Sequence, residues 1–204
     1  FPGVRGRIGR TDMSTSGVDA MRVWIAGAGF GRGEVLAEEE ARIPALDHGI
    51  TVGDGVFETV KGVAGRPFAL SRHLRRLARS AAGIGLPEPD LELVAEGVAR
   101  AVEANADTDP SRIRITMTGG PAPLGSERGA GEPTYIVGVG PFPPIPPSVP
   151  VQTVPWPRNE KGALAGLKTT SYAENVLALK YAHERGASEA VFANTQGNLC
   201  EGTG

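Results

Sequence analysis

The chain has 204 residues, with 21 Lys and Arg against 23 Asp and Glu, so its net charge is −2. This balance gives no electrostatic reason to expect nucleic acid or an acidic membrane surface as a partner. A single cysteine, Cys200, excludes an internal disulfide framework and a cysteine-rich zinc site. No apolar run approaches the roughly 20 residues that cross a bilayer. We therefore expect a folded protein of the reducing cytoplasm, without a membrane segment.

The two ends of the chain differ from the rest. Residues 1–20 are polar, rich in glycine and without periodicity, so we interpret them as a disordered or non-native leader, with Met21 as the natural start. At the other end the chain stops at Gly204, soon after an apolar strand pattern and without a closing helix. We expect a fragment whose C-terminal domain is incomplete.

Alternating and apolar patterns predict the elements of the first 140 residues. The expected strands are 22–26, 34–37, 56–60, 112–117 and 135–139. Ser71 is expected to cap a helix that runs to about Ile84, and Asp90 a second helix that runs to about Val102. The apolar residues of both helices fall on one face, which predicts that they pack on a sheet.

The composition changes sharply at residues 141–150, which contain six prolines. Such a segment cannot be a helix or a central strand, and we interpret it as an interdomain linker; a surface loop is the alternative. A new strand pattern follows at 151–154. Ser171 and Glu174 form a capping-box pattern for a helix to about Arg185. The chain is therefore predicted to be mixed α/β (α+β).

This pattern divides the chain into an N-terminal α/β domain at 21–140, the linker at 141–150, and the start of a second domain at 151–204. A glycine-rich turn at 27–33 superficially suggests a dinucleotide site, but its spacing is wrong and no helix follows it. The three histidines, His48, His73 and His183, have no partner at metal-ligand spacing, so no metal site is expected.

Three residues are chemically suggestive. Lys168 lies among small and apolar residues just before a predicted helix, where burial would lower the pKa of the amine and allow it to attack carbonyls. The alternative is a lysine that extends its charge to solvent. Arg76 borders the apolar stripe of its helix and could hold a phosphate. Glu201 precedes Gly-Thr-Gly, whose amides could approach an anion.

Four segments together carry a specific resemblance. In chain order they are DHGITVGDGVFETVK at 47–61, HLRRLARSA at 73–81, GLKTTSYAENVLA at 166–178 and ANTQGNLCEGTG at 193–204. They resemble the class IV (fold type IV) pyridoxal-phosphate enzymes, which include branched-chain and D-amino-acid transaminases and 4-amino-4-deoxychorismate lyase. The resemblance runs from about Met21 to Gly204. It implies a two-domain fold with pyridoxal 5′-phosphate in the interdomain cleft, and a homodimer.

The resemblance also implies roles for single residues. Lys168 matches the lysine that forms a Schiff base with the cofactor aldehyde, Arg76 the arginine that binds the phosphate, and Glu201 the glutamate beside the pyridine nitrogen. A carboxylate there favours the protonated ring, which is a better electron acceptor. Tyr172 is expected at the ring hydroxyl or the substrate, with helix packing as the alternative, and Thr203 at the phosphate.

Two further polar residues have less certain places. Asn175 is expected either to reach the cofactor or substrate or to be exposed on its helix. Arg158 lies on a probable loop that leads to Lys168, and the sequence gives it no role.

The resemblance leaves two reactions open. Gly119 stands where D-amino-acid transaminases carry an arginine, and Val52 where branched-chain transaminases show a tyrosine. The spacing from Lys168 to Asn175 resembles that of the aminodeoxychorismate lyases. We therefore expect a lyase of folate biosynthesis that converts 4-amino-4-deoxychorismate to 4-aminobenzoate and pyruvate. The alternative is a transaminase of the branched-chain or D-amino-acid type on the same cofactor.

Overall fold

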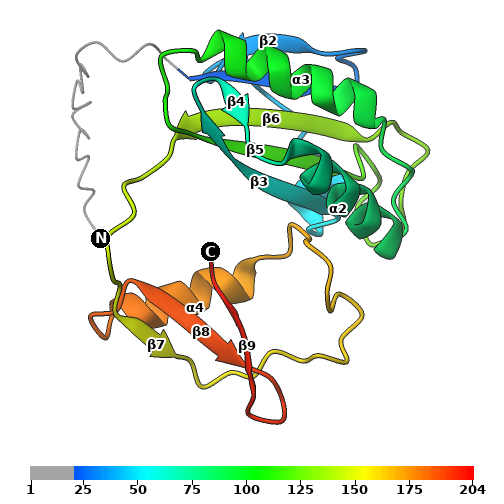
Figure 1. The fold of residues 1–204 in the computed structure, drawn as a ribbon. Helices are drawn as coiled ribbons and strands as arrows, with labels where there is room; N and C mark the ends of the chain where they lie inside the picture. The colour runs from blue at the N-terminus through cyan, green and yellow to red at the C-terminus, as the bar shows by residue number, and fades with distance from the viewer. Residues whose placement is uncertain (1–20) are drawn as a thin grey trace, which may run out of the picture.

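The computed structural model describes residues 21–204; the sequence 1–20, which we interpreted as a leader, lies outside the described residues. The described chain forms two sheets, the larger packed against two helices and the smaller against one (Figure 1). The mixed α/β class predicted from the sequence is confirmed.

The larger sheet is antiparallel throughout. Its six strands lie in the order β2-β1-β6-β5-β3-β4. They are β1 (Arg22–Ala26), β2 (Glu34–Ala37), β3 (Gly55–Val63), β4 (Arg66–Pro67), β5 (Ser111–Thr118) and β6 (Thr134–Pro141). The two-residue β4 pairs only with the end of β3, at Gly62 and Val63, so the rest of β3 has one edge that no strand of the sheet covers.

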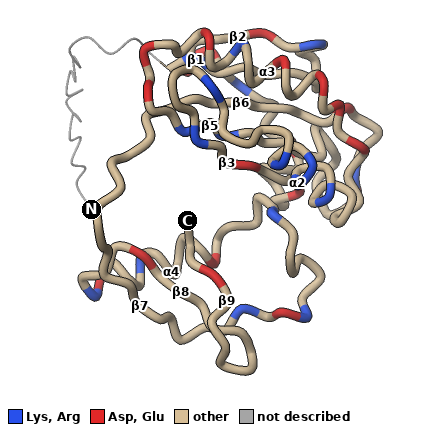
Figure 2. The backbone as a smooth tube through the Cα atoms, in the orientation of Figure 1, with Lys and Arg blue, Asp and Glu red and all other residues tan. Residues whose placement is uncertain are grey.

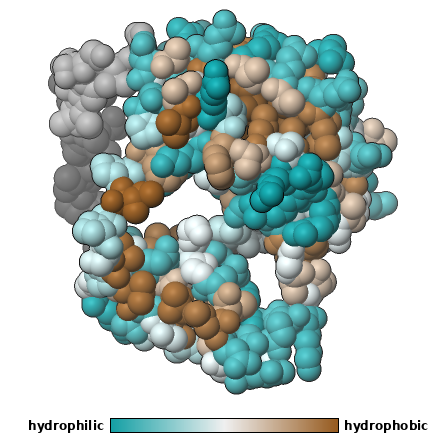
Figure 3. Space-filling view, in the orientation of Figure 1, coloured by the Kyte–Doolittle hydropathy of each residue, from teal (hydrophilic) through white to brown (hydrophobic). Residues whose placement is uncertain are grey.

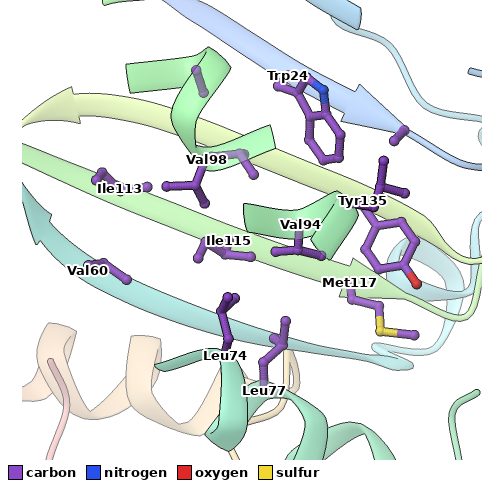
Figure 4. Close-up of a cluster of buried hydrophobic side chains, with 14 of the residues drawn as sticks. Trp24, Val60, Leu74, Leu77, Val94, Val98, Ile113, Ile115, Met117 and Tyr135 are labelled. Atoms are coloured by element: carbon purple, nitrogen blue, oxygen red, sulfur yellow. The ribbon is translucent and has the colours of Figure 1, made fainter. Parts of the chain in front are cut away.

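Helices α2 (Leu70–Gly83) and α3 (Leu91–Ala104) cover one face of this sheet. Alternate residues of the strands meet the apolar stripes of the two helices, as the periodicities predict. Buried members of this cluster include Trp24, Val60, Leu77, Val98 and Ile113 (Figure 4). Burying each such side chain stabilises the fold by roughly 1.5–3 kcal/mol. The hydrophobic core therefore lies on one face of the sheet, and these two helices leave the opposite face free for other contacts.

The smaller sheet follows the proline-rich segment, which runs as an extended link between the two sheets (Figure 1). It contains β7 (Val151–Thr153), β8 (Glu189–Ala193) and β9 (Leu199–Gly202), in the order β7-β8-β9. The β7–β8 pair is parallel because α4 (Ala173–His183) connects the two strands, whereas β8 and β9 are antiparallel. A second, smaller apolar cluster, which includes Ala178 and Phe192, lies between α4 and this sheet.

A short helix, α1 (His48–Thr51), is fastened to the large sheet by one buried carboxylate. Asp47 accepts hydrogen bonds from the Gly49 amide at 2.8 Å and from the hydroxyls of Thr118 and Thr134 at 2.9 and 2.7 Å. These bonds satisfy a carboxylate that is fully buried, as burial requires. They hold the start of α1 against the end of β5 and the start of β6.

The predicted helix starts were right in one case and wrong in two. Asp90 caps α3, accepting from the Leu93 amide at 2.9 Å. Ser71 does not cap α2: the N-cap is Ala69, in the left-handed region at φ 51°, with no side-chain bond. The amide of Phe68 donates to the Lys61 carbonyl, so the hairpin already turns the chain into the helix before Ser71.

The predicted capping box before α4 is also wrong. The N-cap is Tyr172, without a side-chain bond. The Ser171 hydroxyl instead donates to the Gly53 carbonyl at 3.3 Å, and the Glu174 carboxylate accepts from Arg158 at 2.5 Å. Both side chains therefore contact other parts of the chain instead of capping the start of α4.

Two features of the described residues bear on function. None of the helices in residues 21–204 is long and apolar enough to cross a membrane. The same part of the chain contains no group of three His, Cys, Asp or Glu side chains that could hold a metal ion.

Candidate active site

Lys168 is fastened to the large sheet by its backbone. Residues 168–170 run along the uncovered edge of β3: the Phe57 amide donates to the Lys168 carbonyl at 3.1 Å, and the Thr170 amide donates to the Gly55 carbonyl at 2.8 Å. The Lys168 amide donates to the Ser80 hydroxyl of α2 at 3.1 Å. The chain that leads out of the small sheet therefore returns to the large sheet at this lysine.

The side chain of Lys168 lies in an aromatic corner. Its Nζ donates to the Tyr172 hydroxyl at 3.2 Å and lies 4.1 Å from the centroid of the Phe57 ring. The rings of Phe57 and Tyr172 meet edge to face, with centroids 4.8 Å apart. The sequence left open whether this lysine is buried or extends its charge to solvent, and in the structure the residue is half-buried.

A second cation shares the Phe57 ring. The guanidinium carbon of Arg114, on β5, lies 3.3 Å from the ring centroid, so it can be no more than 7.4 Å from Lys168 Nζ, the sum of the two distances to that centroid. Burial lowers the pKa of Arg114, and the nearby Tyr172 phenol opposes this. The ion pairs within residues 21–204 do not include Arg114. It is a cation available to an anionic ligand.

Arg76 is held by a buried carboxylate. Its Nε donates to Glu58 Oε1 at 2.7 Å and its Nη2 donates to Oε2 at 2.6 Å. Nδ1 of His73 lies 2.7 Å from the same Oε2. The bond to Glu58 raises the pKa of Arg76 above its usual value, burial opposes this, and the Tyr172 phenol adds a further attraction. Tyr172 contacts Lys168, and its ring meets the Phe57 ring over which Arg114 lies.

Glu201 belongs to a second cluster, around Arg158. Arg158 Nε lies 2.8 Å from Glu201 Oε1, and its Nη2 donates to Asn175 Oδ1 at 2.7 Å. The guanidinium also lies 4.2 Å from the Phe192 centroid. Asn175 is buried rather than exposed on its helix. Because Asn175 follows Tyr172 by one turn at the start of α4, the two clusters lie next to one another along the helix.

Thr203 is the candidate whose contacts fit its expected role least well. It is buried, and its amide and its hydroxyl both donate to Glu189 Oε1, the amide at 2.9 Å. Burial would raise the pKa of Glu189, but these bonds and those from neighbouring amides outweigh it and lower the pKa. Thr203 would have to give up its bond to Glu189 in order to contact a phosphate.

The structure shows functional candidates that sequence reasoning missed. Glu58 was visible as an acidic residue between Val56 and Val60 in a strand whose alternate positions face the core. Arg114 occupies an alternate position of a strand with a buried opposite face. Neither pattern says which partner lies opposite, because that depends on the order of the strands.

Space-filling atoms leave an opening between the parts of the chain that carry the two sheets (Figure 3).

Comparisons with known proteins show the family of the chain. Residues 55–204 match the family model for amino-transferase class IV. The chain is 30% identical, over 189 residues, to the bifunctional aminodeoxychorismate lyase / D-amino acid transaminase of Mycobacterium tuberculosis, with 83% of this chain and 61% of that protein covered.

Solved structures show the same fold. The fold IV-transaminase CpuTA1 of Curtobacterium pusillum matches with a TM-score of 0.75 and 32% identity, over 90% of this chain and 67% of that one. A hypothetical aminotransferase from Mycobacterium tuberculosis, in its PLP-bound form, matches with a TM-score of 0.73 and 30% identity, over 89% and 65%. The match covers about three fifths (61%) of the length of the bifunctional Mycobacterium tuberculosis enzyme and of a second curated relative, the putative branched-chain-amino-acid aminotransferase of Methanocaldococcus jannaschii.

Proposed function

This chain belongs to the class IV aminotransferases, a family that depends on pyridoxal 5′-phosphate, and we propose that Lys168 is its cofactor lysine and that its reaction is the lyase one. In that reaction 4-amino-4-deoxychorismate yields 4-aminobenzoate and pyruvate. The observation that carries the proposal is the set of contacts at Lys168: its amine lies against the rings of Phe57 and Tyr172, and Arg114 lies over the same Phe57 ring.

The donor set fits the cofactor. The amine of Lys168 suits an aldehyde, and the rings of Phe57 and Tyr172 offer flat apolar surface to a pyridine ring. Arg76 has guanidinium hydrogens that Glu58 does not use, and these suit a phosphate. Glu201, exposed and held by Arg158, offers a carboxylate for a ring nitrogen.

When bound, the cofactor supplies an electron-accepting ring. The chain's own residues supply a base and a position for the substrate. The Tyr172 hydroxyl, 3.2 Å from Lys168 Nζ, orients the amine, which in its neutral form takes a proton from the substrate. Arg114 attracts a carboxylate, and the lyase substrate carries two. Phe57 covers one side of the amine and keeps water from that side.

Two observations bear on the choice of reaction. A relative that is 30% identical is named for both the lyase and D-amino acid transaminase activities, which supports either. The absence of an arginine at Gly119 supports the lyase. The transaminase alternative is favoured by the likeness to the transaminase CpuTA1. In that reaction Lys168 would move a proton between the substrate and the cofactor.

Borohydride labelling tests the assignment of the lysine. The chain is incubated with pyridoxal 5′-phosphate and reduced, and the labelled peptide is sequenced. The label is expected on Lys168 and lost in Lys168→Ala. Lys180→Ala, at an exposed lysine paired with Glu184, is the matched control and should keep the label. A label that stays after Lys168→Ala, or that maps to Lys161, overturns the assignment.

Product analysis tests the reaction. Pyruvate released from 4-amino-4-deoxychorismate without any acceptor keto acid supports the lyase. Amino-group exchange that requires 2-oxoglutarate, with no pyruvate from the first substrate, supports the transaminase.

The wider organisation is part of the same proposal. Separate apolar clusters in the two parts of the chain support a division at residues 141–150. The exposed side chains of Ile50 and Leu124, 65% and 80% accessible, support a homodimer that covers them. A free Cys200 agrees with a reducing cytoplasmic location. Light scattering of the purified chain tests the dimer.

A further inference from the structure

Glu58 is an unusual residue for the middle of a strand. It lies on the core face of β3 between Val56 and Val60, and its side chain has no exposed surface. A carboxylate in such a place must be paired to remain charged. All three of its donors come from one face of α2: Nε and Nη2 of Arg76, and Nδ1 of His73.

These bonds use one edge of the Arg76 guanidinium and leave the other. A guanidinium has five N–H donors in a rigid plane, which form two bidentate edges. Glu58 takes the edge made by Nε and Nη2. The edge made by Nη1 and the second hydrogen of Nη2 points away from this carboxylate. The side chain of Arg76 is 44% exposed, so the second edge can reach a ligand.

Arg76 differs from the neighbouring arginines of α2 because a carboxylate holds its guanidinium. Arg72, Arg75, Arg76 and Arg79 line a hollow of about 630 Å³ beside α2, and the blue stretches of the backbone tube on this helix in Figure 2 mark Lys and Arg positions. The ion pairs within residues 21–204 include Arg76 but not the other three. A phosphate near α2 therefore meets several guanidiniums, of which the buried carboxylate orients one.

We propose that Glu58 is a positioning residue: it fixes the Arg76 guanidinium so that its second edge is presented to the cofactor phosphate. This inference rests on the proposed function. An arginine that is already oriented loses less side-chain freedom when an anion binds, so the phosphate is bound more tightly. Glu58 also neutralises the charge of Arg76, so recognition depends on the direction of the N–H donors more than on net charge.

The test compares pyridoxal 5′-phosphate with pyridoxal, which lacks the phosphate. Dissociation constants for both compounds are measured by absorbance on the chain and on Glu58→Gln. The variant is expected to bind the phosphate ester at least tenfold more weakly and to bind pyridoxal within threefold of the parent. In an Arg76→Lys background the Glu58→Gln change should have no further effect on the phosphate ester. Glu96→Gln, which removes a half-exposed carboxylate of α3 outside this hollow, is the matched control and should change neither constant by more than threefold.

Each result decides between the roles. An equal loss for both compounds means that Glu58 only holds α2 on β3, and the inference is wrong. An unchanged or tighter affinity for the phosphate ester in Glu58→Gln overturns it as well. If Glu58→Gln does not fold, Glu58→Asp keeps the charge but withdraws it by one methylene, and it must weaken the phosphate ester selectively. If neither compound labels Lys168 after reduction, the proposed function fails and takes this inference with it; a label with unaltered phosphate preference overturns the inference alone.

Discussion

Replacement of Arg158 by Met tests how the second cluster is held together. Met keeps much of the aliphatic volume and removes the charge. The partners Glu174 and Glu201 are 72% and 51% exposed, so each lost ion pair costs about 0–1 kcal/mol. The buried Asn175 loses a donor, which costs about 1–3 kcal/mol, and the contact with Phe192 is worth about 0.5–1 kcal/mol. We expect a total destabilisation of roughly 2–4 kcal/mol, dominated by the buried amide.

Urea unfolding followed by circular dichroism measures this difference, and the thermal midpoint should fall by roughly 5–15 °C. Glu174→Gln is the matched control, because it removes an exposed partner only and should cost less than about 1 kcal/mol. High salt should reduce the small effect of Glu174→Gln and leave most of the effect of Arg158→Met. If the two variants lose equal stability, or if Arg158→Met costs less than about 0.5 kcal/mol, the weight given to burial here is wrong.

Three further outcomes follow from the packing. Gly97→Ala in α3 should destabilise by roughly 1–3 kcal/mol despite the better helix propensity of alanine, because a Cβ at this position would lie 2.5 Å from the Trp24 ring; equal or higher stability in urea would contradict this. The hydrogen bond from Arg128 lowers the pKa of Asp54 below its ordinary 3.8. The stability that this pair contributes is therefore fully present above pH 3.8 and is lost as the pH falls below it. Asp54→Asn should flatten the decline in unfolding free energy between about pH 4 and pH 2. Tyr172→Phe removes the 3.2 Å bond to the lysine amine and should slow borohydride labelling by about 2–10-fold without moving the label; an unchanged rate would count against a role in orienting the amine.

Local patterns were enough to place most elements. The strand patterns at 22–26, 34–37 and 112–117 correspond to β1, β2 and β5, and the Asp90 cap is where the sequence predicted it. These features depend on the alternation of apolar residues and on one side chain near a helix start, both of which are local. The capping prediction at Ser71 failed because α2 already begins at Leu70, whereas the one at Ser171 failed because its hydroxyl donates to the distant Gly53 carbonyl.

The amino-acid order by itself determined the class of fold, the apolar faces and the family to which the four segments point, since each depends on residues close together in the chain. Only the tertiary structure decided that residues 168–170 complete the edge of β3, that Glu58 holds Arg76, and that Arg158 joins Glu201 to α4. Those contacts join residues 16 to 115 positions apart, and the partners depend on how the strands and helices are arranged in space. A sequence pattern indicates which residues are buried or charged. Which oppositely charged residue pairs with each of them depends on how elements that are distant in the sequence pack together.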